Sequence, residues 1–281
     1  MDISGKTKLY CLFGHPVAHS MSPAMHNAAF KSLGIDAVYL AFDVLPENTG
    51  DMVSAIRTLP ILGCNLTMPL KNTVIPFLDE LDREAEISGS VNTIKNEDGR
   101  LIGYTTDGKG YFDSLYDAGF DIMGKNMTLL GAGGAAKSII VKGAMSGVSE
   151  MYVFKRKNAS YSETEEFIEK VKRETGAKIE LLPFEDEDAL KEKISESDLL
   201  TNATNVGMGE DKNSPVKKEY LHGNLFVSDI IYHPEETTLL KDGKETGCKI
   251  LNGKDMLYFQ GAQSFKIWTG EDMPVGKDII G

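Results

Sequence analysis

Short apolar runs alternate with helix-like segments along almost the whole chain, and this alternation limits the fold more than any other feature of the sequence. In the first third, strands are predicted at residues 8–14, 37–44 and 61–67, and helices at 23–33 and 48–58. A strand, a helix and a further strand in succession are the repeating unit of parallel sheets. The chain has 281 residues, a length that suits about two domains. We therefore expect an α/β fold in two domains.

The alternation starts again near residue 126, after a predicted hairpin and a connecting helix. The hairpin covers residues 91–104 and turns at Asp98-Gly99, and the helix is predicted at 106–120. The second series contains strands at 126–130, 150–154, 178–182, 198–204, 225–231 and 248–253, with helices after the Gly-rich turn at 131, near 162–175, near 186–196 and at 254–270. A cleft between the two domains is the expected place for a ligand.

The first helix carries clear signals at both ends. Ser22 is predicted to cap it, Pro23 suits the first helical position, and Gly34 follows its last residue. These signals place a helix directly after a polar, histidine-rich loop.

Composition and charge exclude several classes of partner. The formal charge of −12 argues against nucleic acid and anionic membranes, because both are bound by dense patches of Lys and Arg. No run of about 18 apolar residues is present, and the amino terminus lacks a secretory apolar segment. Cys11, Cys64 and Cys248 lie far apart in apolar sequence and are predicted to be reduced core residues. We expect a cytoplasmic protein.

A glycine-rich turn opens the second series. In LLGAGGAAKS, Gly131, Gly133 and Ala136 fit the dinucleotide pattern G-x-G-x-x-A between a strand and a helix. Gly131 permits a tight turn, Gly133 lets the backbone approach a pyrophosphate, and Ala136 allows close helix packing. The alternative is a tight turn that serves packing alone.

The turn after the next strand favours NADP over NAD. NAD-binding folds usually place a carboxylate there for the ribose hydroxyls, whereas NADP-binding folds place a cation for the 2′-phosphate. Here the strand runs into Lys155, Arg156 and Lys157. These cations attract a phosphate, although a solvated basic turn would have the same sequence.

Four polar side chains follow predicted strands in the first half. Thr67 and Lys71 come after the third strand, Asn92 begins the hairpin, and Asp107 precedes the connecting helix. Open α/β sheets collect ligand groups at the ends of their strands. The set suits a small, heavily hydroxylated molecule, but the spacing alone does not distinguish it from four unrelated surface groups.

The stretch GHPVAHSMSPAMHN concentrates histidines and serines between residues 14 and 27. A metal site, a nucleophile with its base and a polar cradle are all consistent with these residue types. Pro16 prevents a helix that would stack His15 on His19, and no Cys, Asp or Glu within the stretch completes a zinc set. The chain also lacks the G-x-S-x-G elbow of serine hydrolases. We therefore expect no metal.

Six motifs together resemble one family, the shikimate dehydrogenases (shikimate/quinate dehydrogenase family). They are GHPVAHSMSPAMHN, GCNLTMPLK, GSVNTI, GYTTDG, GAGGAA and FQGAQSF, in the same order and at compatible intervals over essentially the whole chain. The resemblance implies an oxidoreductase that acts on a CH–OH group. Its expected reaction is the reversible, NADP-dependent reduction of 3-dehydroshikimate to shikimate, on the chorismate route to aromatic amino acids.

The resemblance also implies a division of the chain. Residues 1–107, completed by 255–281, would form a substrate-binding domain, and residues 108–254 would form an NADP-binding Rossmann domain. The expected partner is the small-molecule substrate, with no nucleic acid and no membrane, and a homodimer is a candidate assembly.

Site residues follow by position from the matching motifs. Lys71 and Asp107 match the catalytic pair of the family. The residues expected to bind substrate are Ser20, Ser22, Thr67, Lys71, Asn92, Asp107, Tyr232 and Gln260. Those expected to bind the cofactor are Arg83, Gly131, Ala132, Gly133, Gly134, Ala135, Lys155, Arg156, Lys157, Ile230 and Gly253. The resemblance thus makes Ser20 and Ser22 functional and leaves His15, His19 and His26 with structural roles.

Two departures from the family pattern keep alternatives open. The usual Asn-Arg-Thr after the second nucleotide strand is Lys155-Arg156-Lys157 here, so NAD stays an alternative cofactor. The stretch TNATNVGM (201–208) resembles the branch that also accepts quinate with NAD or NADP, whereas both serines and Thr67 favour shikimate. A non-catalytic sensor of nucleotides or metabolites is a remote alternative, which the presence of both Lys71 and Asp107 disfavours. A two-domain dehydrogenase acting on folates would not explain the paired serines.

Overall fold

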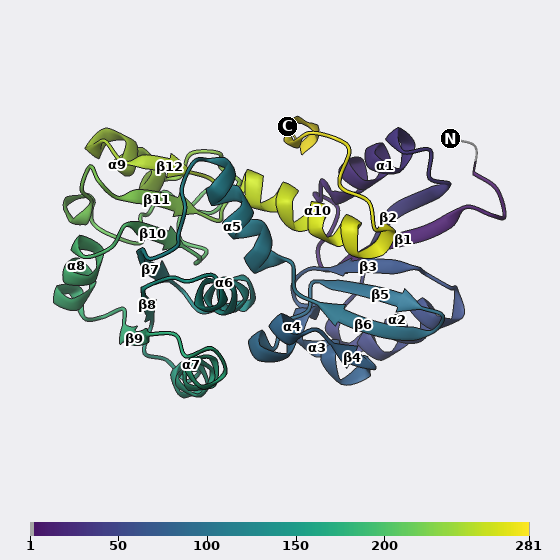
Figure 1. Cartoon of the computed structure of the whole chain (residues 1–281), viewed down its shortest axis with the longest axis horizontal. Helices are drawn as coiled ribbons and strands as arrows, with labels where there is room; N and C mark the ends of the chain where they lie inside the picture. The colour runs from purple at the N-terminus through teal and green to yellow at the C-terminus, as the bar shows by residue number, and fades with distance from the viewer. Residues whose placement is uncertain (1–2, 281) are drawn as a thin grey trace. The chain divides into compact units, whose positions relative to one another are not determined.

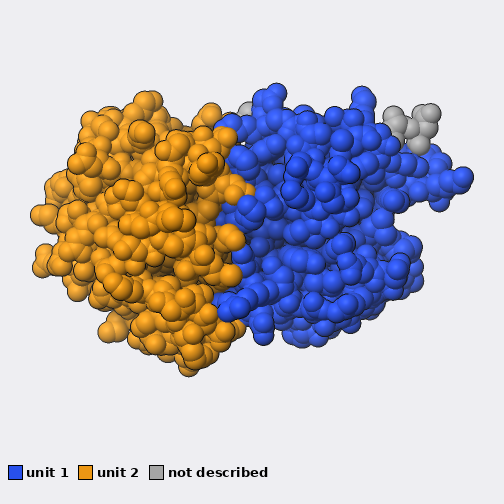
Figure 2. Space-filling view, viewed as in Figure 1, with its two compact units in different colours: residues 1–110, 258–281 blue, residues 111–257 orange. Residues whose placement is uncertain are grey.

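The computed structural model describes residues 3–280 and divides into two compact units. Unit 1 combines Met1–Gly110 with Tyr258–Gly281, and unit 2 is Tyr111–Leu257; Figure 2 colours them separately. Both divisions fall in the first turn of a helix, α5 (Asp107–Asp117) and α10 (Lys254–Thr269). The division expected from the sequence, after residues 107 and 254, lies at the starts of the same two helices.

Unit 1 is built on a six-stranded mixed sheet in the order β2-β1-β3-β5-β6-β4. β1, β2 and β3 are parallel, as the sequence predicts, whereas β5 and β6 form an antiparallel hairpin. The hairpin turns at Asp98 and Gly99, which have φ angles of 52° and 94° and so suit a tight primed turn. The strands are β1 (Lys8–Gly14), β2 (Ala37–Asp43), β3 (Gly63–Leu66), β4 (Glu80–Leu81), β5 (Thr93–Glu97) and β6 (Arg100–Tyr104).

Helices cover both faces of this sheet (Figure 1). Successive residues of β1 point to opposite faces: Cys11 and Phe13 join one apolar cluster with α2, and Tyr10 and Leu12 join another with α1 and α10. The helices of unit 1 are α1 (Ser22–Ser32), η1 (Pro46–Asn48), α2 (Thr49–Thr58), α3 (Leu70–Thr73), η2 (Ile75–Phe77), α4 (Arg83–Ser88) and η4 (Lys277–Ile280), with part of α5 and most of α10. The carboxyl-terminal segment therefore completes the core of the amino-terminal unit.

The predicted cap of the first helix is wrong. α1 begins at Ser22 itself, its cap residue is Met21, and no side chain caps it. Ser22 is buried, and its side chain lies close enough to Tyr39 on the neighbouring strand to oppose the rise in the pKa of that tyrosine. Gly34 follows the helix end with a φ of 65°, in agreement with its predicted place.

Unit 2 contains a second six-stranded sheet, in which every neighbouring pair is parallel. Its order, β12-β11-β10-β7-β8-β9, is that of a doubly wound dinucleotide-binding fold. The strands are β7 (Asn126–Leu130), β8 (Glu150–Lys155), β9 (Ile179–Pro183), β10 (Leu199–Asn202), β11 (Phe226–Asp229) and β12 (Lys249–Leu251). The helices are α6 (Gly134–Met145), α7 (Tyr161–Thr175), α8 (Glu187–Ser195), η3 (Lys218–Tyr220) and α9 (Thr238–Thr246).

The point where the strand order reverses lies between β7 and β10. Ligands of such sheets bind at this switch point, beyond the carboxyl ends of the strands. The glycine-rich turn follows β7 directly, so the fold places it there. Along residues 3–280, none of the helices is both long enough and apolar enough to cross a bilayer.

Candidate active site in unit 1 and nucleotide loop in unit 2

Lys71 and Asp107 form an ion pair in unit 1. Lys71 lies in α3, just past the end of β3, and Asp107 is the first residue of α5. Lys71 Nζ is 2.5 Å from Asp107 Oδ2, and the two side chains are 18% and 6% exposed. A mostly buried charge is costly unless it is paired and hydrogen-bonded, and this ion pair gives each of the two groups its partner. The arrangement presents an ammonium group that can donate a proton or stabilise negative charge on an oxygen.

Asn92 and Gln260 extend this pair. Asn92 Nδ2 lies 2.8 Å from Asp107 Oδ1 and 3.3 Å from Gln260 Oε1, so it donates to both groups. Asn92 Oδ1 accepts the Thr106 backbone N–H at 2.8 Å, which fixes the orientation of the amide. Four residues that the sequence analysis selected therefore come together from α3, the start of β5, α5 and α10.

Ser20 precedes α1, Ser22 is the first residue of that helix, and Thr67 follows β3. Ser20 Oγ accepts the Ser22 backbone N–H at 3.3 Å, so the two serines are neighbours. Burial raises the pKa of Tyr39 well above its usual value, and a hydrogen bond with Ser22 opposes that rise. The Thr67 backbone N–H donates to Phe13 at 2.9 Å, which ties the loop after β3 to β1. Within residues 3–280, neither Ser20 nor Thr67 hydrogen-bonds to the Lys71 side chain.

Several buried residues that hydrogen-bond around this pair were not selected from the sequence, among them Tyr39, Asn65, Thr93, Thr106 and Ser264. Asn65 and Thr93 occupy strands, Thr106 follows one, and all three hydrogen-bond within the same buried region. A polar residue within an apolar strand is a sequence signal, since burying it requires a partner. Asn65 and Thr93 carry this signal. Their hydrogen-bond partners could not be predicted from it, because those partners lie on other elements.

The glycine-rich turn of unit 2 has the geometry that the motif requires. Gly131 has a φ of 105°, and a Cβ atom there would lie 2.7 Å from the Ala203 carbonyl oxygen. Gly133 precedes α6, and no heavy atom lies within 4 Å of the position of its Cβ. Gly131 is thus required by the protein itself, whereas Gly133 leaves space beside a helix amino terminus, which suits a phosphate group.

The basic turn after β8 is exposed at Arg156 and Lys157. Lys155 Nζ bonds to Ser160 Oγ at 2.9 Å, and the Lys157 backbone N–H donates to the Glu185 carboxylate at 3.2 Å. Among residues 3–280, no side chain or backbone group hydrogen-bonds or pairs with the exposed Arg156 guanidinium, so its donors face solvent. Arg156 is therefore the best placed of the three to meet a phosphate.

The other predicted cofactor and substrate residues are distributed over both units. Ile230 follows β11, and a Cβ atom on Gly253 would overlap the Ile230 carbonyl oxygen, so these two residues pack closely in unit 2. Tyr232 also belongs to unit 2 and is 37% exposed. Arg83 is exposed at the start of α4 in unit 1.

The three histidines of the first loop do not form a cluster. His15 Nδ1 pairs with Asp43 Oδ1 at 2.5 Å, His19 is exposed, and His26 is buried. The His26 ring stacks on Tyr39 with ring centres 4.5 Å apart, beside Trp268 at 5.2 Å. In the described part of the chain, no group of three or more His, Cys, Asp or Glu side chains could hold a metal ion.

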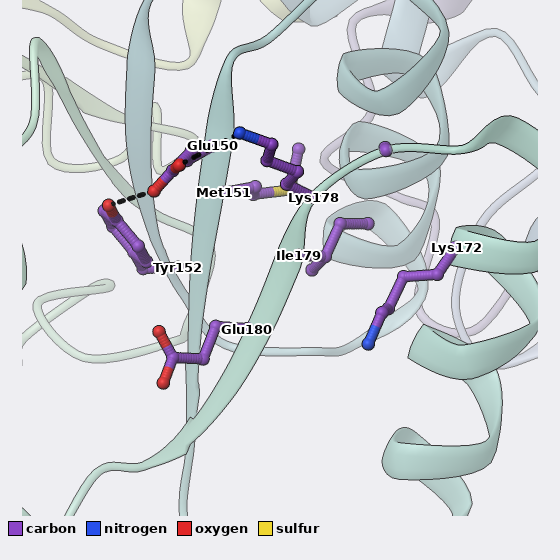
Figure 3. A pocket seen from close by; sticks show the side chains of 8 residues that line it. Glu150, Met151, Tyr152, Lys172, Lys178, Ile179 and Glu180 are labelled. Carbon is purple, nitrogen blue, oxygen red and sulfur yellow. Dashed lines mark hydrogen bonds and ion pairs between the residues drawn. The ribbon is translucent and has the colours of Figure 1, made fainter.

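A cavity of about 370 Å³ opens on β8, β9 and α7 (Figure 3). Glu150 accepts a hydrogen bond from Tyr152 Oη at 2.8 Å and pairs with Lys178. These three polar side chains of the cavity lining therefore bond to one another. The cavity is lined by the first residues of β8 and β9, whereas ligands of this fold bind at the carboxyl ends. It contains none of the predicted site residues.

Comparisons with known proteins identify the family. The profile described as the shikimate dehydrogenase substrate binding domain matches residues 12–94. The NADP(+) shikimate dehydrogenase of Listeria innocua is 44% identical over 99% of this chain and 97% of its own length. That of Alkaliphilus metalliredigens is 46% identical over 97% and 95%. A crystal structure of shikimate 5-dehydrogenase from Listeria monocytogenes with shikimate and NAD superposes with a TM-score of 0.94, at 43% identity, over 100% and 97% of the two chains.

These similarities extend over both units and, at more than 40% identity, over almost the whole chain. The chain belongs to the shikimate dehydrogenase family.

Proposed function

We propose that this protein catalyses the reversible, NADP-dependent reduction of 3-dehydroshikimate to shikimate. The observation that carries the proposal is the Lys71–Asp107 ion pair, bonded through Asn92 to Gln260, in a chain of this family. An ammonium, a carboxylate and two amides suit a small ring with several hydroxyl groups. The reaction belongs to the synthesis of aromatic amino acids.

NADP fits the residues of unit 2. Gly133 leaves open space at the amino end of α6, and Arg156 presents free donors after β8. The loop from Gly131 to Ala135 would hold the pyrophosphate, and Arg156 with its neighbouring lysines would hold the 2′-phosphate. When bound, NADP supplies or takes up the hydride.

In this proposal Lys71 is the general acid and base. Its ammonium donates a proton to the carbonyl oxygen during reduction, and its neutral amine accepts that proton during oxidation. Asp107 accepts a hydrogen bond from Lys71 Nζ and holds that nitrogen in place. Ser20 and Ser22 bind the substrate carboxylate, with Tyr232 close to it, and Thr67, Asn92, Asp107 and Gln260 hold the ring hydroxyls.

The test is an absorbance assay of the reduced nicotinamide in a two-by-two design: shikimate or quinate, each with NADP or NAD. We expect the highest kcat/KM with shikimate and NADP. Comparable values with quinate or NAD would instead establish the dual-specificity alternative, which is relevant because the Listeria monocytogenes structure contains NAD. Absence of turnover in all four combinations would contradict the proposed function and favour a sensor.

We further infer a cytoplasmic enzyme that assembles as a homodimer. Cys11, Cys64 and Cys248 are free and buried, which suits a compartment that keeps thiols reduced. β2 is an edge strand of its sheet and exposes Leu40 and Phe42, which a second copy could cover. Sedimentation velocity at micromolar concentration tests the dimer, and a single monomeric species would contradict it.

A further inference from the structure

Beneath the Lys71–Asp107 pair, a second group of polar side chains is buried in unit 1. Asn65 of β3, Thr93 of β5 and Ser264 of α10 are 5%, 0% and 0% exposed. Ser264 Oγ lies 2.7 Å from Thr93 Oγ1 and 2.9 Å from Asn65 Nδ2. Three elements far apart in the sequence therefore meet at one hydroxyl group.

The proton directions in this group follow from its outer partners. Tyr39 Oη donates to Asn65 Oδ1 at 2.8 Å, so the Asn65 amide must turn its nitrogen towards Ser264. Thr93 has one hydroxyl proton, which it donates to Asn92 Oδ1 at 3.0 Å, so at the 2.7 Å contact between the two hydroxyls Ser264 is the donor and Thr93 the acceptor. The Ser264 lone pairs are then free to accept from Asn65 Nδ2.

The group leads directly to the substrate residues. Thr93 Oγ1 lies 3.0 Å from Asn92 Oδ1, on the side of the amide opposite to Asp107. Ser264 Oγ also lies 3.1 Å from the backbone oxygen of Gln260, whose side chain accepts from Asn92. Buried hydrogen bonds that satisfy one another fix a single arrangement, whereas a partly broken network leaves several. The group thus constrains both amides that meet the ring hydroxyls.

We propose that Asn65, Thr93 and Ser264 are positioning residues that fix the Asn92 and Gln260 side chains against Asp107. They act through those amides and do not touch the substrate. The inference rests on the proposed function, since it assigns Asn92 and Gln260 to the substrate. Through Ser264, helix α10 near the carboxyl terminus would help to set the substrate specificity of unit 1.

The primary test compares Ser264→Ala with Ser197→Ala. Ser197 is a buried serine of unit 2 in a matching setting: its Oγ lies 2.8 Å from the carbonyl oxygen four residues earlier and 2.8 Å from the hydroxyl of a threonine, Thr128. Each substitution removes the same chemical group, so both should lower the melting temperature. Only Ser264→Ala should lower kcat/KM for shikimate, by about tenfold or more, with the KM for NADP within about twofold of wild type.

Thr93 supplies a second pair of variants if Ser264→Ala folds poorly. Thr93→Val keeps the shape and removes the hydroxyl, whereas Thr93→Ser keeps the hydroxyl. We expect Thr93→Val to lower kcat/KM about tenfold and Thr93→Ser to stay within about threefold of wild type. Wild-type kcat/KM in folded Thr93→Val and folded Ser264→Ala would overturn the inference.

A double-mutant cycle separates positioning from general structural support. In an Asn92→Ala background, Ser264→Ala should weaken shikimate binding, measured by calorimetry, by less than about threefold, because the amide that it positions is gone. An undiminished effect in that background would show that Ser264 acts independently of Asn92 and would overturn the inference. If the wild-type protein itself neither binds nor oxidises shikimate, it is the proposed function that fails.

Discussion

At the scale of single residues, the charges of Lys71 and Asp107 carry the proposed chemistry. The two residues are separated by 36 positions in the sequence and by 2.5 Å in the structure. Lys71 lies in α3, a helix of four residues that begins shortly after β3 ends. The end of this strand therefore fixes the position of the Lys71 amine. The pairing gives this mostly buried lysine a partner of opposite charge.

Replacing the Lys71 amine should show whether it acts in proton transfer, measured by kcat, or only in binding, measured by the KM for shikimate. Lys71→Met keeps the length and the packing of the side chain but cannot transfer a proton. We expect kcat to fall about 100-fold or more, measured at saturating shikimate and NADP. If kcat stays near wild type while only the KM for shikimate rises, Lys71 binds substrate and is not the acid/base.

His26 makes a different contribution, because it is buried among aromatic rings. Neither of its ring nitrogens has a hydrogen-bond partner within residues 3–280, and burial lowers the pKa of His26 to about 3, with nearby Asn65 opposing the shift. The unfolded chain keeps an ordinary histidine pKa near 6.5. Between pH 6.5 and pH 3 the unfolded state therefore binds a proton that the folded state does not, so stability falls as the pH is lowered through this window.

This linkage predicts a measurable loss of stability in acid. Lowering the pH from 7.5 to 5 should reduce the free energy of unfolding by about 2 kcal/mol through His26 alone. His26→Phe should remove that part of the pH dependence in urea titrations, and the exposed His19→Phe serves as the control with wild-type behaviour. An unchanged pH dependence in His26→Phe would contradict the assignment.

At the scale of elements, the turn between β7 and α6 combines two glycines with different physical roles. Gly131 has a positive φ and lies against the Ala203 carbonyl, so a side chain there strains the protein. Gly133 has a φ of −75°, which any residue adopts, and open space beside it. Only the bound cofactor would need that space.

Alanine substitutions should therefore give opposite results at these two positions. Gly133→Ala should keep the wild-type melting temperature and raise the KM for NADP about tenfold or more, with the KM for shikimate unchanged. Gly131→Ala should lower the melting temperature. Gly133→Ala with a wild-type KM for NADP would place the pyrophosphate elsewhere.

At the scale of the whole molecule, most of the predicted substrate residues lie in one unit and most of the predicted cofactor residues lie in the other. Of the predicted substrate residues only Tyr232 belongs to unit 2, and of the predicted cofactor residues only Arg83 belongs to unit 1. Each unit has its own sheet and its own apolar clusters. The two ligands should therefore stabilise different parts of the chain.

Hydrogen exchange measures this separation. Shikimate alone should slow amide exchange around residues 92–107, and NADP alone should slow exchange around residues 128–137. A ligand at 100 times its Kd should stabilise its site by about 2.7 kcal/mol. Protection by NADP restricted to residues 92–107 would contradict the assignment of the nucleotide to unit 2.

The sequence by itself determined the order and type of most elements, the nucleotide turn and the family. Apolar periodicity, turn residues and the G-x-G-x-x-A pattern depend on neighbours along the chain, so they predict local structure well. The motifs also selected Lys71, Asn92, Asp107 and Gln260, which the structure brings together.

Only the tertiary structure decided which polar groups meet. Asn65 bonds to Ser264 across 199 positions and Thr93 meets Ser264 across 171, distances at which no sequence period operates. Ser22 was predicted to be a helix cap, but it is buried against Tyr39, because satisfying a buried polar group across the fold outweighs a local capping preference. Local patterns fix elements, whereas the burial of polar groups is resolved only when those elements pack.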